Sequence, residues 1–332
     1  MKAVIADAFG GGWTIGERPD PIPGPDEVVI EIEASGVCYT DIQQLRNTNY
    51  HGTFPRIPGH EPVGIVVAHG SNVDMPKIGM RVGVAYVQRW CGTCEYCLRG
   101  RYEHCPKISA TGVTVDGGHA QFMVAHAGSV QLIPDSIDPV EAAPIMCAGY
   151  TVYSGIKDCA LEPGERCAVI GIGGLGHLAI QYAAALGAEV IAVTRDRGKE
   201  PLLNQLGASK VVVSKSERIG QSLCEIGGVD VILHTANRLE EGILDGLRPY
   251  GRLSLMGVTS DVISSTSQSM IFGKFSIFGS SQGPRERLRE VLELHESADI
   301  KTVIETYSLD DAMSGFAQVE SGRTRFRAVL TP

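Results

Sequence analysis

Residues 166–186 read RCAVIGIGGLGHLAIQYAAAL, and this stretch decides the fold class. RCAVI is a short apolar run typical of a buried strand. GIGGLG at 171–176 follows it and fits the pattern G-x-G-x-x-G, which is weak alone but specific between a strand and a helix. The helix is indicated by apolar side chains at helical spacing, namely Leu175, Leu178, Ala179, Tyr182, Ala183 and Leu186. The stretch therefore predicts a dinucleotide-binding unit; the alternative is a glycine-rich turn in an α/β domain that binds no nucleotide.

The glycines have separate roles in such a turn. Gly171 allows the tight bend, Gly173 lets the backbone approach a pyrophosphate, and Gly176 permits close packing of helix on strand. Gly174 and Leu175 complete the predicted cofactor site at the start of the helix, where N–H groups and the helix dipole attract an anion.

The rest of the chain shows two different patterns of predicted secondary structure. After Glu165, strand-like runs alternate with helical ones: EVIAVT, KVVVS, VDVILH, GRLSLMG and SIFGS indicate a doubly wound parallel sheet. In the first ~140 residues, EVVIEIEASGV, PVGIVVAHG and GMRVGVAYV follow one another at short spacing, which predicts a small antiparallel barrel or sandwich. A chain of 332 residues is also long for one core. We expect two domains.

Composition narrows the partners and the compartment. The net charge is -9 and no basic patch is evident, so we expect no nucleic acid and no membrane partner, but a small molecule or another subunit. The N-terminus reaches Asp7 before a signal-peptide apolar region could form, which favours a cytoplasmic location. Nine cysteines in that reducing compartment favour metal ligation or catalysis over disulfides.

The end of EVIAVT predicts which coenzyme binds. An Asp or Glu there would bind both ribose hydroxyls of NAD, but this strand ends in Thr194-Arg195. Arg195, helped by Arg197 or Lys199, could instead pair with a 2′-phosphate, so NADP(H) is favoured. The alternative is that Asp196 turns in and restores a preference for NAD.

The densest chemical signal is CGTCEYCLRGRYEHC at 91–105. Cys91, Cys94, Cys97 and Cys105 form C-x2-C-x2-C-x7-C, a thiolate set that suits tetrahedral Zn²⁺. Because Pro106 follows the last cysteine, an iron–sulfur cluster stays open as an alternative. Four protein ligands would fill the coordination of zinc, so this site is predicted to be structural.

Catalysis would need a second metal with an open position. The candidates are Cys38 in GVCYTD, His60 and Glu61 in PGHEPVG, and Cys147 in PIMCAGYT. A single buried Cys or His is more often a packed residue than a ligand. Their combination with a four-cysteine site and a dinucleotide-binding unit favours the ligand interpretation.

From MKAVI to its end the sequence resembles the zinc-dependent alcohol dehydrogenases of the medium-chain dehydrogenase/reductase superfamily, and it is most similar to the yeast and bacterial branch. The resemblance rests on C-x-T-D at 38–41, G-H-E at 59–61, the four-cysteine lobe, the Cys147 segment and GIGGLG. It implies a GroES-like β-barrel catalytic domain at 1–146 and 284–332, with the structural-zinc lobe at 91–105, and a Rossmann domain at 147–283.

The resemblance also implies roles for single residues. Cys38, His60 and Cys147 would hold a catalytic zinc, with Glu61 as a transient ligand and Asp41 as the partner of His60. Thr40 and His51 would pass a proton between the reacting oxygen and water. Arg327 would pair with the coenzyme pyrophosphate. Relatives of this branch are commonly homodimers or homotetramers.

The sequence thus predicts an enzyme that interconverts an alcohol and an aldehyde or ketone, with two zinc ions per chain and NADP(H) favoured over NAD(H). One alternative is a reductase of an iminium or a conjugated double bond on the same fold. A second, of another class, is a zinc- and nucleotide-binding protein without turnover. The substrate itself is not predicted, because small pocket changes shift specificity by only ~1–3 kcal/mol and leave no motif.

Overall fold

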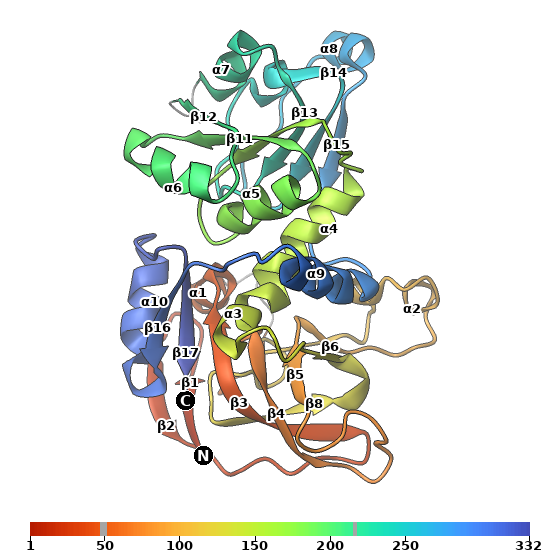
Figure 1. Cartoon of the computed structure of the whole chain (residues 1–332). Coiled ribbons are helices and arrows are strands. Elements are labelled where there is room, and N and C mark those ends of the chain that lie inside the picture. The colour runs from red at the N-terminus through yellow and green to blue at the C-terminus, as the bar shows by residue number, and fades with distance from the viewer. Residues whose placement is uncertain (47–51, 215–217) are drawn as a thin grey trace. The chain divides into compact units, whose positions relative to one another are not determined.

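A computed structural model describes residues 1–46, 52–214 and 218–332 (Figure 1). Within it the chain forms two compact units. The first comprises residues 1–147, 284–296 and 301–332, and the second comprises 148–283 and 297–300. The division predicted from the sequence differs at two places. It assigns Cys147 to the Rossmann domain, but Cys147 belongs to the first unit; it assigns residues 297–300 to the catalytic domain, but they belong to the second unit.

The first unit is built on a seven-stranded sheet whose order is β16-β17-β3-β4-β5-β9, with β8 also paired to β3. Most of these pairs are antiparallel; β16 and β17 are parallel. The strands are β3 (Glu27–Val37), β4 (Pro62–His69), β5 (Arg81–Val84), β8 (Phe122–His126), β9 (Val130–Leu132), β16 (Ile304–Ser308) and β17 (Arg327–Thr331). Every second residue of β3 packs in the core, since Val28, Ile30 and Ile32 share one core cluster with Val66 and Met123.

Two small antiparallel sheets and several short helices complete the first unit (Figure 1). The sheets pair β1 (Lys2–Ala6) with β2 (Trp13–Glu17), and β6 (Val87–Arg89) with β7 (Ser109–Ala110). The helices are α1 (Tyr39–Arg46), α2 (Glu95–Leu98), α3 (Pro139–Pro144), α9 (Glu286–Ser297) and α10 (Ala312–Glu320). A π-helical turn, η3 (Ile145–Gly149), follows α3.

The second unit contains a six-stranded parallel sheet in the order β12-β11-β10-β13-β14-β15. Its strands are β10 (Arg166–Ile170), β11 (Glu189–Thr194), β12 (Lys210–Val213), β13 (Val229–His234), β14 (Leu247–Leu255) and β15 (Ser276–Gly279). Its helices are α4 (Tyr150–Asp158), α5 (Gly176–Ala185), α6 (Glu200–Gln205), α7 (Ile219–Glu225) and α8 (Ser267–Gly273). The strand order reverses between β10 and β13, which is the switch point where such sheets bind dinucleotides. The predicted doubly wound fold is confirmed.

The apolar stripe predicted for α5 is also present. Leu178, Ala179, Tyr182 and Ala183 are fully buried, because the helix lies along the sheet with this side inward. Among the helices that the structure describes, none has the length and apolarity to cross a membrane.

Candidate metal centres and coenzyme site

Four candidate ligands from three parts of the sequence meet in the first unit. The ligand atoms of Cys38, His60, Glu61 and Cys147 all lie within 4.8 Å of one another. Strand pairing explains much of this convergence, since Ser35 near the end of β3 is opposite Pro62 at the start of β4. Cys38 follows β3, and His60 and Glu61 precede β4. Cys147 comes from the π-helical turn η3, a geometry often found at functional sites.

Asp41 on α1 orients the histidine of this cluster. Its Oδ1 lies 3.1 Å from His60 Nδ1, and its Oδ2 accepts a hydrogen bond of 2.9 Å from the Cys38 backbone N–H. Asp41 and His60 are both buried. Because Nδ1 faces the carboxylate, His60 is left with Nε2 for a metal, as in carboxylate–histidine–zinc arrangements.

The protonation of the cluster shows what it is suited to bind. A hydrogen bond from Cys147 holds the pKa of the Cys38 thiol well below its usual range, while the same contact and burial raise the pKa of Cys147. Burial alone would lower the pKa of His60, but the Asp41 carboxylate and the Cys38 sulfur raise it well above its usual value. The cluster thus favours a thiolate at Cys38, beside a thiol and an imidazole whose protons a metal would displace, and thiolate and imidazole are donors that Zn²⁺ prefers.

Two opposing effects act on the pKa of the Glu61 carboxyl group. Burial raises the pKa of its carboxyl group to about 7, although the Arg327 guanidinium opposes the shift. One carboxylate oxygen, Oε2, accepts a hydrogen bond from Arg327, while Oε1 has no hydrogen-bond partner among the described residues. A buried carboxylate oxygen without a partner, next to two sulfurs and an imidazole, fits a bound cation.

The remaining residues predicted for catalysis differ in what the structure says of them. Thr40 lies on the first turn of α1, and its hydroxyl accepts a 3.6 Å contact from Cys38 Sγ. His51 lies outside the described residues. Arg327, predicted to hold a pyrophosphate, is nearly buried and bonded to Glu61; its contact with the coenzyme stays a prediction.

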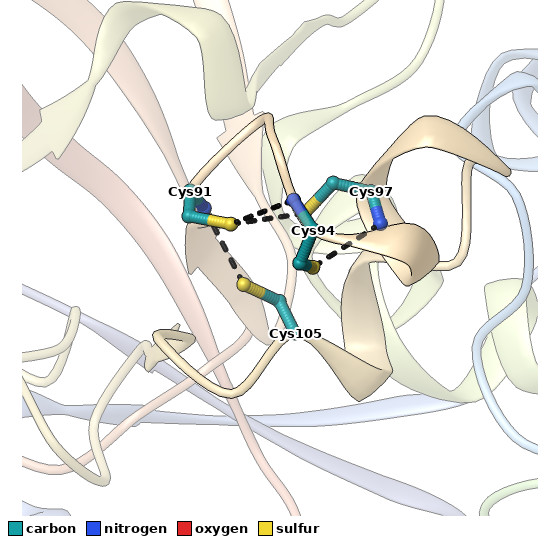
Figure 2. A group of neighbouring side chains, drawn as sticks. All are labelled: Cys91, Cys94, Cys97 and Cys105. Atoms are coloured by element: carbon teal, nitrogen blue, oxygen red, sulfur yellow. Dashed lines mark hydrogen bonds between the residues drawn. The ribbon is translucent and has the colours of Figure 1, made fainter.

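Figure 2 shows the four-cysteine lobe, in which all four sulfurs point toward one another. Backbone N–H groups point at these sulfurs: Cys91 N lies 3.3 Å from Cys105 Sγ, Cys94 N lies 3.3 Å from Cys91 Sγ, and Cys97 N lies 3.5 Å from Cys94 Sγ. N–H bonds to sulfur from Thr93 and Cys94 lower the pKa of Cys91 to about 5. All nine cysteines of the chain are described, and all are free thiols.

The spacing of these sulfurs bears on the choice between zinc and an iron–sulfur cluster. Four sulfurs at about 2.3 Å from one tetrahedral zinc would lie about 3.8 Å apart. The Sγ atoms of Cys91 and Cys97 are 3.9 Å apart, and all four lie within 4.8 Å. The lobe therefore fits a single ion, with no position left open for a substrate.

The glycine turn of the second unit has the geometry that its sequence requires. Gly171 has φ +91°, and a Cβ there would lie 2.5 Å from the backbone nitrogen of Ala236. A Cβ at Gly176 would lie 2.2 Å from the carbonyl oxygen of Gly171, whereas one at Gly173 would meet nothing within 4 Å. Gly171 and Gly176 are thus needed for packing, and Gly173 faces open space in which a pyrophosphate could approach.

The end of β11 bears on the coenzyme's ribose. Thr194 Oγ1 accepts a 3.1 Å hydrogen bond from the Asp196 N–H, and Asp196 Oδ1 in turn accepts a 2.8 Å bond from the Gly198 N–H. The carboxylate that could have restored NAD binding thus caps the short turn η4 (Arg197–Lys199). Arg195 is exposed, and Lys199 is half-buried at the end of that turn.

Two family models match the chain. The alcohol dehydrogenase GroES-like domain covers residues 24–135, and the zinc-binding dehydrogenase domain covers residues 174–297. An alcohol dehydrogenase (notN) of Aspergillus sp. (strain MF297-2) is 34% identical, over 99% of this chain and 97% of the relative. An alcohol dehydrogenase of Geobacillus stearothermophilus is 36% identical, over 99% and 98%. The chain therefore belongs to the zinc-binding alcohol dehydrogenases of the medium-chain dehydrogenase/reductase superfamily.

Solved structures share the fold but differ in coenzyme. A putative zinc-binding dehydrogenase from Sinorhizobium meliloti 1021 bound to NADP has a TM-score of 0.89 and 26% identity, covering 100% of this chain and 99% of the other. An NAD-dependent alcohol dehydrogenase has a TM-score of 0.91 and 25% identity, covering 100% of both. Both zinc and a nicotinamide coenzyme belong to this family, but the fold does not decide which nicotinamide coenzyme binds.

Proposed function

We propose that this protein interconverts an alcohol and an aldehyde or ketone by hydride exchange with a nicotinamide coenzyme, with NADP(H) favoured. The observation that carries the proposal is the meeting of Cys38, His60 and Cys147, with Glu61 beside them, in one cluster in which only Cys147 is partly exposed. Zinc held there would supply a Lewis acid that makes an alcohol acidic or polarises a carbonyl group. Cys91, Cys94, Cys97 and Cys105 would hold the second, structural zinc.

Residues around this zinc would then orient its ligands and transfer the proton. Asp41 holds the imidazole of His60 in one tautomer, because its carboxylate accepts from Nδ1. Thr40, whose hydroxyl lies beside Cys38, would hydrogen-bond the reacting oxygen and pass its proton on, and His51 would carry that proton to water. Arg327 would keep Glu61 charged and turned toward it.

The preference for NADP(H) rests on the end of β11. Thr194 offers no carboxylate to the ribose, Asp196 is used as a turn cap, and Arg195 is exposed where a 2′-phosphate would need a cation. The glycine turn, including Gly174 and Leu175 ahead of α5, would bind the pyrophosphate. A homodimer or homotetramer is also part of the proposal, on the resemblance alone, and a cytoplasmic location is part of it on the N-terminal sequence.

Metal analysis combined with an NADPH-linked screen over alcohols, aldehydes and imines tests this function. We expect two zinc ions per chain, and turnover of an alcohol or carbonyl compound. Cys38→Ser should abolish turnover while circular dichroism stays native, and Cys224→Ser, an exposed cysteine outside both clusters, should leave turnover unchanged. Turnover only of imines or conjugated double bonds would replace the substrate class, and retained activity in Cys38→Ser would reject the ligand assignment.

A further inference from the structure

The geometry points to His119 as a positioning residue for the candidate catalytic zinc site, acting through Asp41. This inference rests on the proposed function, because it concerns the metal that Cys38, His60 and Cys147 would bind. His119 carries no motif in the sequence. It lies in the DGGH segment ahead of β8, and its side chain is fully buried.

The two ring nitrogens of His119 face different partners. Nδ1 lies 2.9 Å from the hydroxyl oxygen of Ser35 on β3; Nε2 has no hydrogen-bond partner among the described residues and faces Asp41 Oδ2 at 3.6 Å, within ion-pair distance. A carboxylate accepts hydrogen bonds and donates none, so the nitrogen that faces it carries the proton. When the imidazole is neutral, Ser35 therefore donates to Nδ1, and this bond selects the tautomer with Nε2–H toward Asp41.

Asp41 is consequently held at both oxygens. Oδ1 faces His60 Nδ1 at 3.1 Å, and Oδ2 faces the Cys38 N–H at 2.9 Å and His119 Nε2 at 3.6 Å. The Cys38 N–H belongs to a ligand residue and the His60 ring is the group being positioned. His119 is thus a side chain outside the proposed ligand set that lies against this carboxylate. Because the orientation of a ligating imidazole follows its carboxylate partner, His119 influences where His60 Nε2 points.

Backbone hydrogen bonds hold the segment that carries His119 against the segment that precedes His60. Three hydrogen bonds join residues 117–119 to residues 57–59, directly before His60: Gly117 N to Ile57 O at 2.8 Å, Gly118 N to Gly59 O at 2.9 Å, and His119 N to Pro58 O at 3.0 Å. A Cβ at Gly59 would lie only 2.7 Å from the His119 ring, so the residue just before His60 packs directly on it.

Phe316 closes the other side of the His119 ring. Its ring meets the imidazole edge to face, with ring centroids 5.4 Å apart. This packing fixes the plane of the imidazole, and the hydrogen bond between Ser35 and Nδ1 favours the orientation in which Nε2 faces Asp41.

Zinc affinity, measured separately for the two sites, tests the role of His119. His119→Phe keeps a ring of similar shape against Gly59 and Phe316 but removes both nitrogens, whereas His119→Gln keeps an N–H donor that can reach Asp41. By chelator competition we expect His119→Phe to weaken zinc binding at the catalytic site about 10- to 100-fold. His119→Gln should recover most of that loss. The visible spectrum of the cobalt-substituted catalytic site should change in the Phe variant and return toward wild type in the Gln variant.

The four-cysteine lobe is the internal control, because it lies in the same unit and shares no residue with this network. Unchanged affinity of the catalytic site in His119→Phe, with the lobe intact, would overturn the inference. Should the Phe variant lose zinc from both sites through misfolding, His119→Leu decides, because leucine is smaller and also lacks both nitrogens: wild-type affinity at the catalytic site would then refute the role of His119. If the wild-type protein itself binds zinc only at the lobe, the proposed function fails instead.

Discussion

Arg327 donates a hydrogen bond to the carboxylate of Glu61, and their side chains are only 4% and 0% exposed. Removing one partner of a buried ion pair leaves an uncompensated charge away from water. Arg327→Met should therefore lower the free energy of unfolding by about 3–5 kcal/mol. Urea denaturation followed by circular dichroism measures it.

An exposed ion pair of the same unit is the control for this prediction. Arg46 and Glu320 are joined at 3.1 Å, with side chains 51% and 41% exposed. Arg46→Met should cost less than about 1 kcal/mol. Adding Glu61→Gln to Arg327→Met should recover part of the lost stability, because the buried charge is then gone. Equal costs for Arg327→Met and Arg46→Met would contradict the prediction.

The ion pair between Arg327 and Glu61 is a contact that could not be predicted from the sequence. The parallel sheet and the glycine turn were predictable because strand and helix periods are local, and the four cysteines because they lie within one short loop. Arg327 and Glu61 are 266 residues apart, and they meet because β17 and β4 both pair with β3. The resemblance predicted only a coenzyme contact for Arg327. His119 was missed for the same reason, since no spacing in the sequence links it to Asp41.

The two glycines of the coenzyme turn should respond differently to the same substitution. Gly173→Ala adds a methyl group that meets nothing in the protein but occupies the space proposed for the pyrophosphate. We expect an unchanged melting temperature and a dissociation constant for NADPH at least about tenfold higher, a difference of about 1.4 kcal/mol. Fluorescence titration measures the binding.

Gly171→Ala is the matched comparison. At φ +91°, with Ala236 N 2.5 Å from the new Cβ, alanine should lower the stability of the second unit by more than about 1 kcal/mol. A Gly173→Ala variant that binds NADPH as tightly as the wild type would show that the coenzyme does not approach this turn.

Arg195 should decide between the two coenzymes. If its guanidinium pairs with the 2′-phosphate, Arg195→Ala removes a charge-assisted bond worth about 1.5–3 kcal/mol, so the dissociation constant for NADPH should rise about 10- to 100-fold. Binding of NADH, which has no such phosphate, should stay the same.

Lys210→Ala is the control for Arg195. Lys210 is an exposed cation at the start of β12, and the coenzyme is expected at the other end of the parallel strands, where they finish. Calorimetry of all three proteins with both coenzymes gives the comparison. Tighter binding of NADH than NADPH by the wild-type protein would reverse the assignment.

The four-cysteine lobe should stabilise the fold and take no part in the reaction. Cys97 is 6% exposed, its Sγ lies 3.9 Å from Cys91 Sγ, and its N–H points at Cys94 Sγ. Cys97→Ser should leave one zinc per chain instead of two, and it should lower the melting temperature strongly, because structural zinc can contribute on the order of 10 kcal/mol to folding.

The serine variant of Cys224 separates the loss of zinc from the loss of a thiol. Cys224 is exposed and outside both clusters, so Cys224→Ser should keep two zinc ions and the wild-type melting temperature. Equal melting temperatures for Cys97→Ser and Cys224→Ser would mean that the lobe carries no structural ion. If Cys97→Ser instead stayed folded at low temperature with one zinc, its remaining turnover would show that the chemistry belongs to Cys38, His60 and Cys147. The densest cluster of ligands in the sequence would then serve the fold, because a closed set of four sulfurs leaves a substrate no place on the metal.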